Sequence, residues 1–416
     1  MKAIIILSVL IILSSVPEAA SGELDLKSAA LEQFEEGNYR KAIQYLKEAE
    51  QSSPDNPEIY YYLGYFTHYL CYDSVPLSGF NLDKSEEVLG YLSKAVELKP
   101  DYGNAYYFIG AECGARARIK LMQGDIQGAR KEFIRGRSLG GYPDWLIEYG
   151  RNTLKSCSEN AILFLGGDAD TNPVEYLQLV KDYRTDITCI PVALLGRPWF
   201  VRMIRDGIKG VLPAAPVSWS DYQIMNMHNY KWKSNTVEVE ICEEAREEYG
   251  IENGLFGWNL DPDISERLLS AGAAAIADII TTNHFRRDIH FSLAMGKVAG
   301  LSDNMQLCGL TMKLVPVPAS GTRLEVDTES VRKVLLNREN YRMLPGSATE
   351  GMPRISGILL NYPAALLQLC GYHLRRGEKE SAAEIFDLLD EVEMEKYMDM
   401  GRLKPHLEMY RKMASE

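Results

Sequence analysis

The 416-residue sequence lacks several features that would point to a specific chemistry. It has no run of basic residues, no C-x-x-C pair and, beyond its first 22 residues, no stretch of 18 apolar residues. The net charge of −13 repels phosphate groups, which disfavours nucleic acids and anionic membranes as ligands. Seven scattered cysteines without paired spacing argue against a zinc cluster and favour buried structural thiols.

Catalytic motifs are also missing. The sequence contains neither H-E-x-x-H nor G-x-S-x-G, and neither a P-loop nor G-x-G-x-x-G. No cofactor is therefore predicted, and a catalytic role is disfavoured. Six histidines are dispersed along the chain, and only His284 and His290 stand close together, around an Arg-Arg-Asp segment. These residues predict either a hydrogen-bonded hinge between a helix and a strand or a polar site beside Asp168.

The first 22 residues have the pattern of a signal peptide. Lys2 precedes an apolar segment at residues 3–16, Pro17 interrupts it, and small residues follow at 19–22. The apolar segment is too short for a comfortable membrane span. The sequence therefore predicts a cleaved signal peptide over residues 1–22 and export to the periplasm or the cell exterior. An uncleaved anchor is the alternative.

Residues 24–155 show a repeat of helical pairs. Gly37, Ala42, Leu46 and Pro54 occupy the turn, crossing, core and end positions of a tetratricopeptide unit, and the pattern recurs twice more before residue 140. The second pair carries an insertion at residues 71–82, and the third resumes seven residues late, which indicates a helix extended by two turns. One pair cannot bury its apolar face alone, so the pairs should stack as a solenoid. The role predicted is binding a protein or peptide on the concave face, or only bracing the next domain.

The hydrophobic period changes after residue 157. Strands are expected at 160–167, 185–196, 288–295 and 307–318, with helices at 172–183, 197–207 and 263–285. This β-α-β-α order predicts a parallel-sheet α/β domain over residues 158–318. A linker over 319–353 and a C-terminal helical repeat-like hairpin over 354–416 follow. The fold class predicted is thus a multidomain α and α/β chain.

Three short motifs lie around the ends of the first two expected strands of the α/β segment. They are Gly167-Asp168-Ala169-Asp170-Thr171, Arg184-Thr185-Asp186-Ile187 and Trp199-Phe200. With these motifs the segment resembles the extracytoplasmic module of a bacterial membrane-protein family of unknown function that is related to eukaryotic protein O-mannosyl-transferases. The resemblance covers residues 158–318 and implies the fold of that module.

Two departures limit what this resemblance implies. The family has a many-helix membrane portion before the module, and here a tetratricopeptide array takes its place. The asparagine usual between the two aspartates is Ala169. Because transfer chemistry would belong to the missing portion, the resemblance implies a shared fold and no glycosyl transfer.

The candidate ligand-binding residues lie around the first strand. They are Asp168, Asp170, Thr171, Arg184 and Trp199. Asp168 and Asp170 follow the strand's carboxyl end, where ligand sites of parallel sheets form. They predict a turn and helix cap, a ligand or sugar-hydroxyl site, or a catalytic metal site, and the metal is unknown. Trp199, Trp219 and Trp232 predict either core packing or stacking on sugar rings.

The function predicted from the sequence is that of an exported, non-enzymatic scaffold of a bacterial cell envelope. It would bind a protein or glycan partner, with no nucleic acid and no membrane span after signal cleavage. The alternative is a carbohydrate-active, glycosyl-transfer-related enzyme or accessory subunit that uses the Asp168/Asp170 loop.

Overall fold

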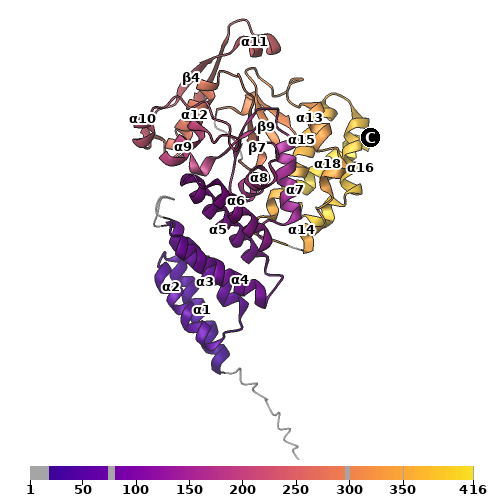
Figure 1. Ribbon diagram of the computed structural model, residues 1–416. Helices are drawn as coiled ribbons and strands as arrows, with labels where there is room; N and C mark the ends of the chain where they lie inside the picture. Colours follow the sequence, from indigo (N-terminus) through magenta and orange to yellow (C-terminus); the bar gives the residue numbers. More distant parts are fainter. Residues whose placement is uncertain (1–17, 74–79, 296–299, 350, 416) are drawn as a thin grey trace, which may run out of the picture. The chain divides into compact units, whose positions relative to one another are not determined.

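The computed structural model describes residues 18–73, 80–295, 300–349 and 351–415. The chain divides into two compact units, Met1–Ala105 and Tyr106–Glu416. Figure 1 shows the first in indigo and purple and the second from purple to yellow. Most of the predicted signal peptide, residues 1–17, lies outside the described residues.

The first unit contains two helical pairs. The helices are α1 (Glu18–Glu35), α2 (Tyr39–Ser52), α3 (Pro57–Asp73) and α4 (Leu82–Leu98). Ala42, Leu46 and Ala49, on one face of α2, are fully buried. Gly37 adopts φ +79° in the turn between α1 and α2, a conformation that favours glycine. At Gly64 of α3 an added Cβ would lie 2.6 Å from Leu92 Cδ2, so α3 and α4 cross in close contact.

The second unit begins inside α5 and includes the third helical pair. Its first helices are α5 (Gly103–Met122), α6 (Ile126–Ser138) and α7 (Asp144–Lys155). The 20-residue α5 confirms the predicted extended helix. Glycines allow close packing here: a Cβ on Gly110 would lie 2.6 Å from the Gly141 carbonyl oxygen, and one on Gly150 would lie 2.8 Å from Pro173 Cβ. The second contact joins α7 to α8 (Asp168–Lys181).

A five-stranded mixed sheet occupies the middle of this unit. Its order is β2-β1-β7-β9-β8. The strands are β1 (Ile162–Leu165), β2 (Thr188–Pro191), β7 (Ile289–Ser292), β8 (Met305–Cys308) and β9 (Thr311–Leu314). β1 pairs in parallel with β2 and β7, while β9 runs antiparallel to both β7 and β8. The predicted fold class is confirmed, with an antiparallel hairpin added to the parallel strands.

Four local predictions were wrong. The strand expected at 307–318 is split into β8 and β9, because Gly309 turns the chain with φ +60°. The helix expected at 263–285 is α12 (Ala271–Asn283), since Ser270 caps it and Asp263 accepts hydrogen bonds from Ser270 instead. The Asp-Pro pair at 261–262 predicts a loop over residues 257–263, but this segment begins within β5 (Leu255–Leu260). Pro173 predicts a helix that begins beside it, but α8 begins at Asp168, so Pro173 lies inside the helix.

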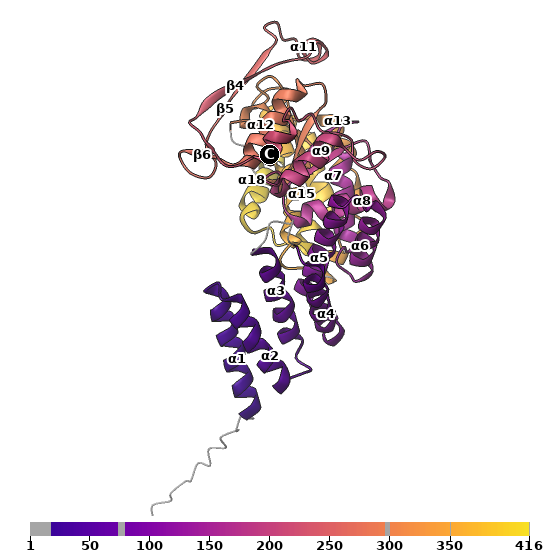
Figure 2. The same cartoon turned by 60° about the vertical axis from the view of Figure 1, so that its left-hand side comes forward.

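The segment between β2 and α12 carries short elements and a long hairpin. The short elements are η2 (Val192–Leu194), α9 (Pro198–Asp206), α10 (Asp221–Met225), β3 (Tyr230–Lys231) and β6 (Leu268–Leu269). β4 (Asn235–Glu240) pairs antiparallel with β5, and α11 (Glu243–Tyr249) connects them. Figures 1 and 2 both show α11 at the tip of this hairpin, which projects from the rest of the second unit.

The C-terminal helices share a core with α7 and the sheet. The main helices are α15 (Asn361–Arg375), α16 (Lys379–Glu391) and α18 (Lys404–Ser415), which confirm the predicted hairpin and terminal helix. Shorter elements are η3 (Leu293–Met295), η4 (Ser302–Asn304), α13 (Thr328–Val334), η5 (Arg338–Tyr341), α14 (Gly346–Thr349), η6 (Ser356–Leu360), α17 (Met394–Tyr397) and η7 (Gly401–Leu403). Trp145, Leu307, Leu335 and Leu366 belong to one buried cluster, to which residues 319–353 also contribute.

Among the described helices, none combines the length and the apolar character that crossing a membrane requires. Six of the seven cysteines are free thiols, namely Cys113, Cys157, Cys189, Cys242, Cys308 and Cys370, and all of these except Cys242 are buried. Burial raises the pKa of the Cys113 thiol to about 12, so this thiol stays protonated at neutral pH.

Candidate functional site

Three parallel strands end at the same edge of the sheet, and the chain leaves β1 and β7 in opposite directions. After β1 the chain passes through α8 to β2 on one side, whereas β7 lies on the other side of β1. Ligand sites of α/β sheets form at such a switch point. Here it is closely packed: a Cβ on Gly166 would lie 2.9 Å from Met295 Cα and 3.0 Å from the Ala294 carbonyl oxygen.

Asp170 is fully buried beneath this edge. Its Oδ2 accepts a hydrogen bond of 2.8 Å from the Gly166 amide, so a side chain in the first turn of α8 reaches back to the end of β1. Its Oδ1 makes no hydrogen bond of standard geometry with the described residues. Burial raises the pKa of Asp170 to about 7, against the opposing effects of Gly166 and Ser292.

Asp168 points away from Asp170. The two side chains are two positions apart on one helix, and such residues do not face each other. Asp168 Oδ1 lies 3.7 Å from Arg118 Nη1 on α5, and its side chain is 41% exposed. The helix is capped by Gly167, at φ +77°, with no side-chain cap, so the predicted aspartate cap was wrong.

The first turn of α8 is held by α5. Arg118 donates to Glu175 Oε2 at 3.0 Å and to Asn172 Oδ1 at 2.6 Å. Thr171 is buried, and its amide donates to the Gly167 carbonyl. No group of three metal-ligating side chains occurs in the described part of the chain. The two aspartates therefore diverge into structural contacts, and the structure does not bring them together around a common ligand.

Arg184 lies at the other edge of the sheet. It precedes β2 and donates to the carbonyls of Leu154, Cys157 and Ser158, and its guanidinium pairs with Asp186 at 2.8 Å. Asp186 in turn accepts from the Asn160 amide before β1. Arg184 thus fixes the entrances to β1 and β2, and it is not near the aspartates that follow β1.

Trp199 begins the first turn of α9, after β2, and is half-buried. Its ring packs edge-on against Phe200, with the centroids 5.6 Å apart, and its indole nitrogen is buried without a hydrogen-bond partner in the described residues. The five sequence candidates therefore form no single site.

The histidine segment is a hinge, as the first of the two sequence interpretations held. Arg287 donates to the carbonyls of Asn160, Ala161 and Ala214, and His290 is buried between Ser158 and Thr311. Residues 284–288 precede β7 and His290 lies at its start, whereas Asp168 follows the end of the parallel strand β1. The two lie at opposite edges, so a polar site beside Asp168 was the wrong alternative.

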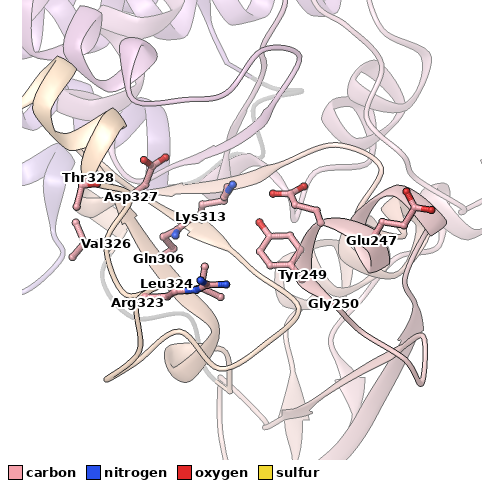
Figure 3. Close-up of a pocket in the computed structure, with 11 residues that line it drawn as sticks. Glu247, Tyr249, Gly250, Gln306, Lys313, Arg323, Leu324, Val326, Asp327 and Thr328 are labelled. Carbon is pink, nitrogen blue, oxygen red and sulfur yellow. The ribbon is translucent and has the colours of Figure 1, made fainter.

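A polar cavity of about 550 Å³ lies between α11 and the hairpin β8/β9. Figure 3 shows Lys313 of β9 and Tyr249 at the end of α11 pointing into it from opposite sides. Lys313 Nζ lies 3.6 Å from Asp288, and only 12% of its side chain is exposed. The remaining lining residues are Glu247, Glu248, Gly250, Gln306, Arg323, Leu324, Val326, Asp327 and Thr328.

The charges of this cavity exclude a nucleophilic lysine. Burial lowers the pKa of Lys313, but the Asp288 carboxylate and the contact with the Tyr249 hydroxyl oppose that effect, and the net shift is upward. Burial also raises the pKa of Tyr249 to about 12. Lys313 thus stays protonated and Tyr249 stays neutral, which suits binding a polar ligand and not acid–base chemistry near pH 7.

Lys313 and Arg118 were not among the residues predicted from the sequence. The sequence did not indicate that Lys313 is buried, because a single lysine in a strand is usually solvent-exposed. Arg118 did give a signal: it lies in "GARARIKL", where an arginine amid apolar and small residues of a buried helix demands an acidic partner.

The fold and its contacts define a class: a helical-repeat protein whose third helical pair packs on a mixed α/β module. Both the helical repeats and the α/β module are similar to known protein families. Residues 30–68 match the family model described as TPR repeat, and residues 146–255 match TMEM260-associated domain 2. The chain is 25% identical over 127 residues to Protein O-mannosyl-transferase TMEM260 of Mus musculus.

This likeness is partial. The alignment covers 27% of this chain and 16% of the mouse protein, so the chain matches about one sixth of that relative's length. The match to the TPR repeat model confirms the tetratricopeptide prediction. The match to TMEM260-associated domain 2 shows that residues 146–255 resemble a domain of TMEM260-type proteins.

The pH dependence of stability tests the buried state of Asp170. Its folded pKa of about 7 exceeds the ordinary value of 3.8, so the folded state binds the extra proton between these pH values. The free energy of unfolding should then fall as pH rises from about 4 to 7, by up to about 4 kcal/mol. Asp170→Asn should remove this fall, as measured by urea denaturation at each pH.

Asp186 provides a matched control, because its pKa is shifted in the opposite direction to that of Asp170. The hydrogen bond from Arg184 holds the pKa of Asp186 below its usual range, so the stabilisation by Asp186 is lost only as pH drops below about 4. Asp186→Asn should leave the window from pH 4 to 7 unchanged. Equal pH profiles for wild type and Asp170→Asn would show that Asp170 is hydrated and accessible.

Proposed function

We propose that this chain is a non-enzymatic scaffold that binds a protein partner through its first unit. The observation that carries the proposal is a row of half-exposed tyrosines on α3, within the segment that matches the TPR repeat model and just beyond it. Tyr62, Tyr65 and Tyr69 follow one another at helical spacings of three and four. Arrays of helical pairs generally bind protein segments on such surfaces.

The surroundings of this row suit a peptide segment. Phe34 of α1 lies 5.1 Å from Tyr65 and 5.4 Å from Tyr69 between ring centroids. Lys27 of α1 pairs with Glu58 of α3 at 3.0 Å, and both act on the pKa of Tyr62. Rigid aromatic rings with polar edges supply contact area at low entropy cost. Tyr60 and Tyr61, by contrast, are buried and serve the core.

The enzyme alternative gains little support from the site. Asp170 has a pKa suited to acid–base catalysis, but its full burial separates it from any substrate. The partial likeness to an O-mannosyl-transferase concerns a segment whose aspartates and arginine serve structural contacts here. We therefore propose an accessory, partner-binding role over sugar transfer by this chain.

Photo-crosslinking tests the binding face. Benzoylphenylalanine at position 62 of the full chain should yield discrete crosslinks to one or few proteins, identified by mass spectrometry. The purified partner should then bind the wild-type chain, and Tyr65→Ala should weaken that binding about tenfold, since hot-spot aromatics contribute over 1 kcal/mol.

The control is a tyrosine of similar exposure on another helix. Tyr45 of α2 is also half-buried. Benzoylphenylalanine at position 45 should give no discrete crosslink, and Tyr45→Ala should leave affinity unchanged. The same crosslinks at both positions, or none at 62, would contradict the proposal.

We further propose that the chain is exported to a bacterial cell envelope. The apolar segment at residues 3–16, followed by small residues, supports this location. N-terminal sequencing of protein recovered from the envelope fraction should begin shortly after residue 19, and deletion of residues 1–22 should leave the protein inside the cell. An intact Met1 on envelope-associated protein would indicate an anchor, and full-length protein in the cytosol would refute export.

A further inference from the structure

A second cavity, of about 560 Å³, opens between α12 and the segment that includes α10 and β3. Its size falls within the range of small-molecule sites. Five of its lining residues have aromatic rings: Trp219, Tyr222, His228, Tyr230 and Trp232. Polar side chains also line it, among them Gln223, Asn226 and Asp278. All of these lie in the second unit.

One face of helix α12 forms one wall of this cavity. Ala274, Ala277, Asp278 and Thr281 are spaced by three, one and three residues, so they share one side of the helix. The alanines are small and leave room beside the helix. Asp278 adds a carboxylate to this wall, while the Thr281 hydroxyl donates to the Ala277 and Asp278 carbonyls of the same helix.

Aromatic side chains form the opposite wall of the cavity, and a hydrogen bond fixes one of them. The Trp232 indole nitrogen donates to the Leu260 carbonyl at 2.9 Å, which fixes the plane of the ring. His228 and Tyr230 stand with ring centroids 4.6 Å apart. Tyr222 is 78% exposed, a large solvent-facing area for an aromatic side chain. Such rings offer flat apolar faces to a ligand, with polar edges nearby.

Asp278 retains the capacity to accept hydrogen bonds. Its two oxygens each accept one hydrogen bond, from the Ser218 amide at 2.9 Å and from the Ser218 hydroxyl. A carboxylate has about four acceptor positions, so about two remain for a ligand. The amides of Gln223 and Asn226 add donors and acceptors along the aromatic wall.

We propose that this cavity is a binding site for a pyranose sugar. A sugar ring has C–H faces that stack on aromatic rings and a rim of hydroxyl groups that both donate and accept hydrogen bonds. Trp219 and Trp232 supply the stacking surfaces, while Asp278 and the two amides bind the hydroxyls. The site goes beyond the proposed protein-binding role, because it lies in the other unit and shares no residue with α3.

Two other ligand classes fit less well. A proline-rich segment also docks on aromatic grooves, but its proline residues have no N–H to donate to Asp278. A quaternary ammonium ion prefers an aromatic cage without competing cations. Here Lys231 lines the same cavity, and Ser218 already donates twice to the carboxylate.

Tryptophan fluorescence of the full chain tests the proposal. The probes are the methyl glycosides of glucose, mannose and galactose, N-acetylglucosamine, and disaccharides of each. We expect saturable quenching by at least one saccharide. Trp219→Ala should weaken its binding about tenfold, the size of one lost stacking contact. Trp219→Phe should retain most of the affinity, which separates loss of stacking from misfolding.

The matched control is Trp199→Ala, which removes a half-buried tryptophan outside this cavity and should leave sugar affinity unchanged. Asp278→Asn should reduce affinity, since an amide offers one acceptor oxygen in place of two. No saturable binding by any saccharide, or binding insensitive to Trp219→Ala, would overturn the proposal. Binding of deca-proline or tetramethylammonium in place of sugars, lost in Trp219→Ala, would also overturn it.

Discussion

The second unit depends on one buried guanidinium. Arg118 of α5 is 8% exposed and contacts three side chains of α8: Glu175, Asn172 and Asp168. Burial raises the pKa of Glu175, and the charge and hydrogen bond of Arg118 oppose that rise only in part. A buried charge without a partner costs several kcal/mol, so α5 and α8 can only pack with these groups matched. This interaction joins the third helical pair to the α/β module.

The contacts of Arg118 explain the form of the segment that follows β1. Asn172 reaches Arg118 because Gly114 of α5 has no side chain, and a Cβ there would lie 2.4 Å from Asn172 Oδ1. Asp168 faces the same arginine, while Asp170 turns under the sheet to the Gly166 amide. Asp168 and Asp170 thus make two different structural contacts on opposite sides of α8. The ligand surfaces that we propose lie elsewhere, on α3 and along α12.

Much of this architecture could be predicted from the sequence. The glycine, alanine and proline spacing of helical pairs and the apolar strands before helices identified the repeats, β1, β2 and β7. The site could not be predicted, because the orientation of Asp168 and Asp170 depends on where α8 begins, and Gly167 occupies its N-cap position in place of an aspartate. Arg184 precedes β2 and Asp168 follows β1, so they lie at opposite edges of the sheet only because the two strands run parallel. The cavities beside Lys313 and α12 are lined by residues far apart in the sequence, and hydrophobic periodicity does not reveal such contacts.

The central claim is that the acidic segment after β1 is a structural joint held by Arg118, and a double-mutant cycle tests it directly. Arg118→Met and Glu175→Gln should each lower the free energy of unfolding by about 3–5 kcal/mol, since each leaves a buried charge without its partner. The double variant should lose much less than the sum, with a coupling energy of about 2 kcal/mol or more. Additive effects of less than about 1 kcal/mol each would contradict the account. They would show that Arg118 and the carboxylates are hydrated and free to bind a ligand.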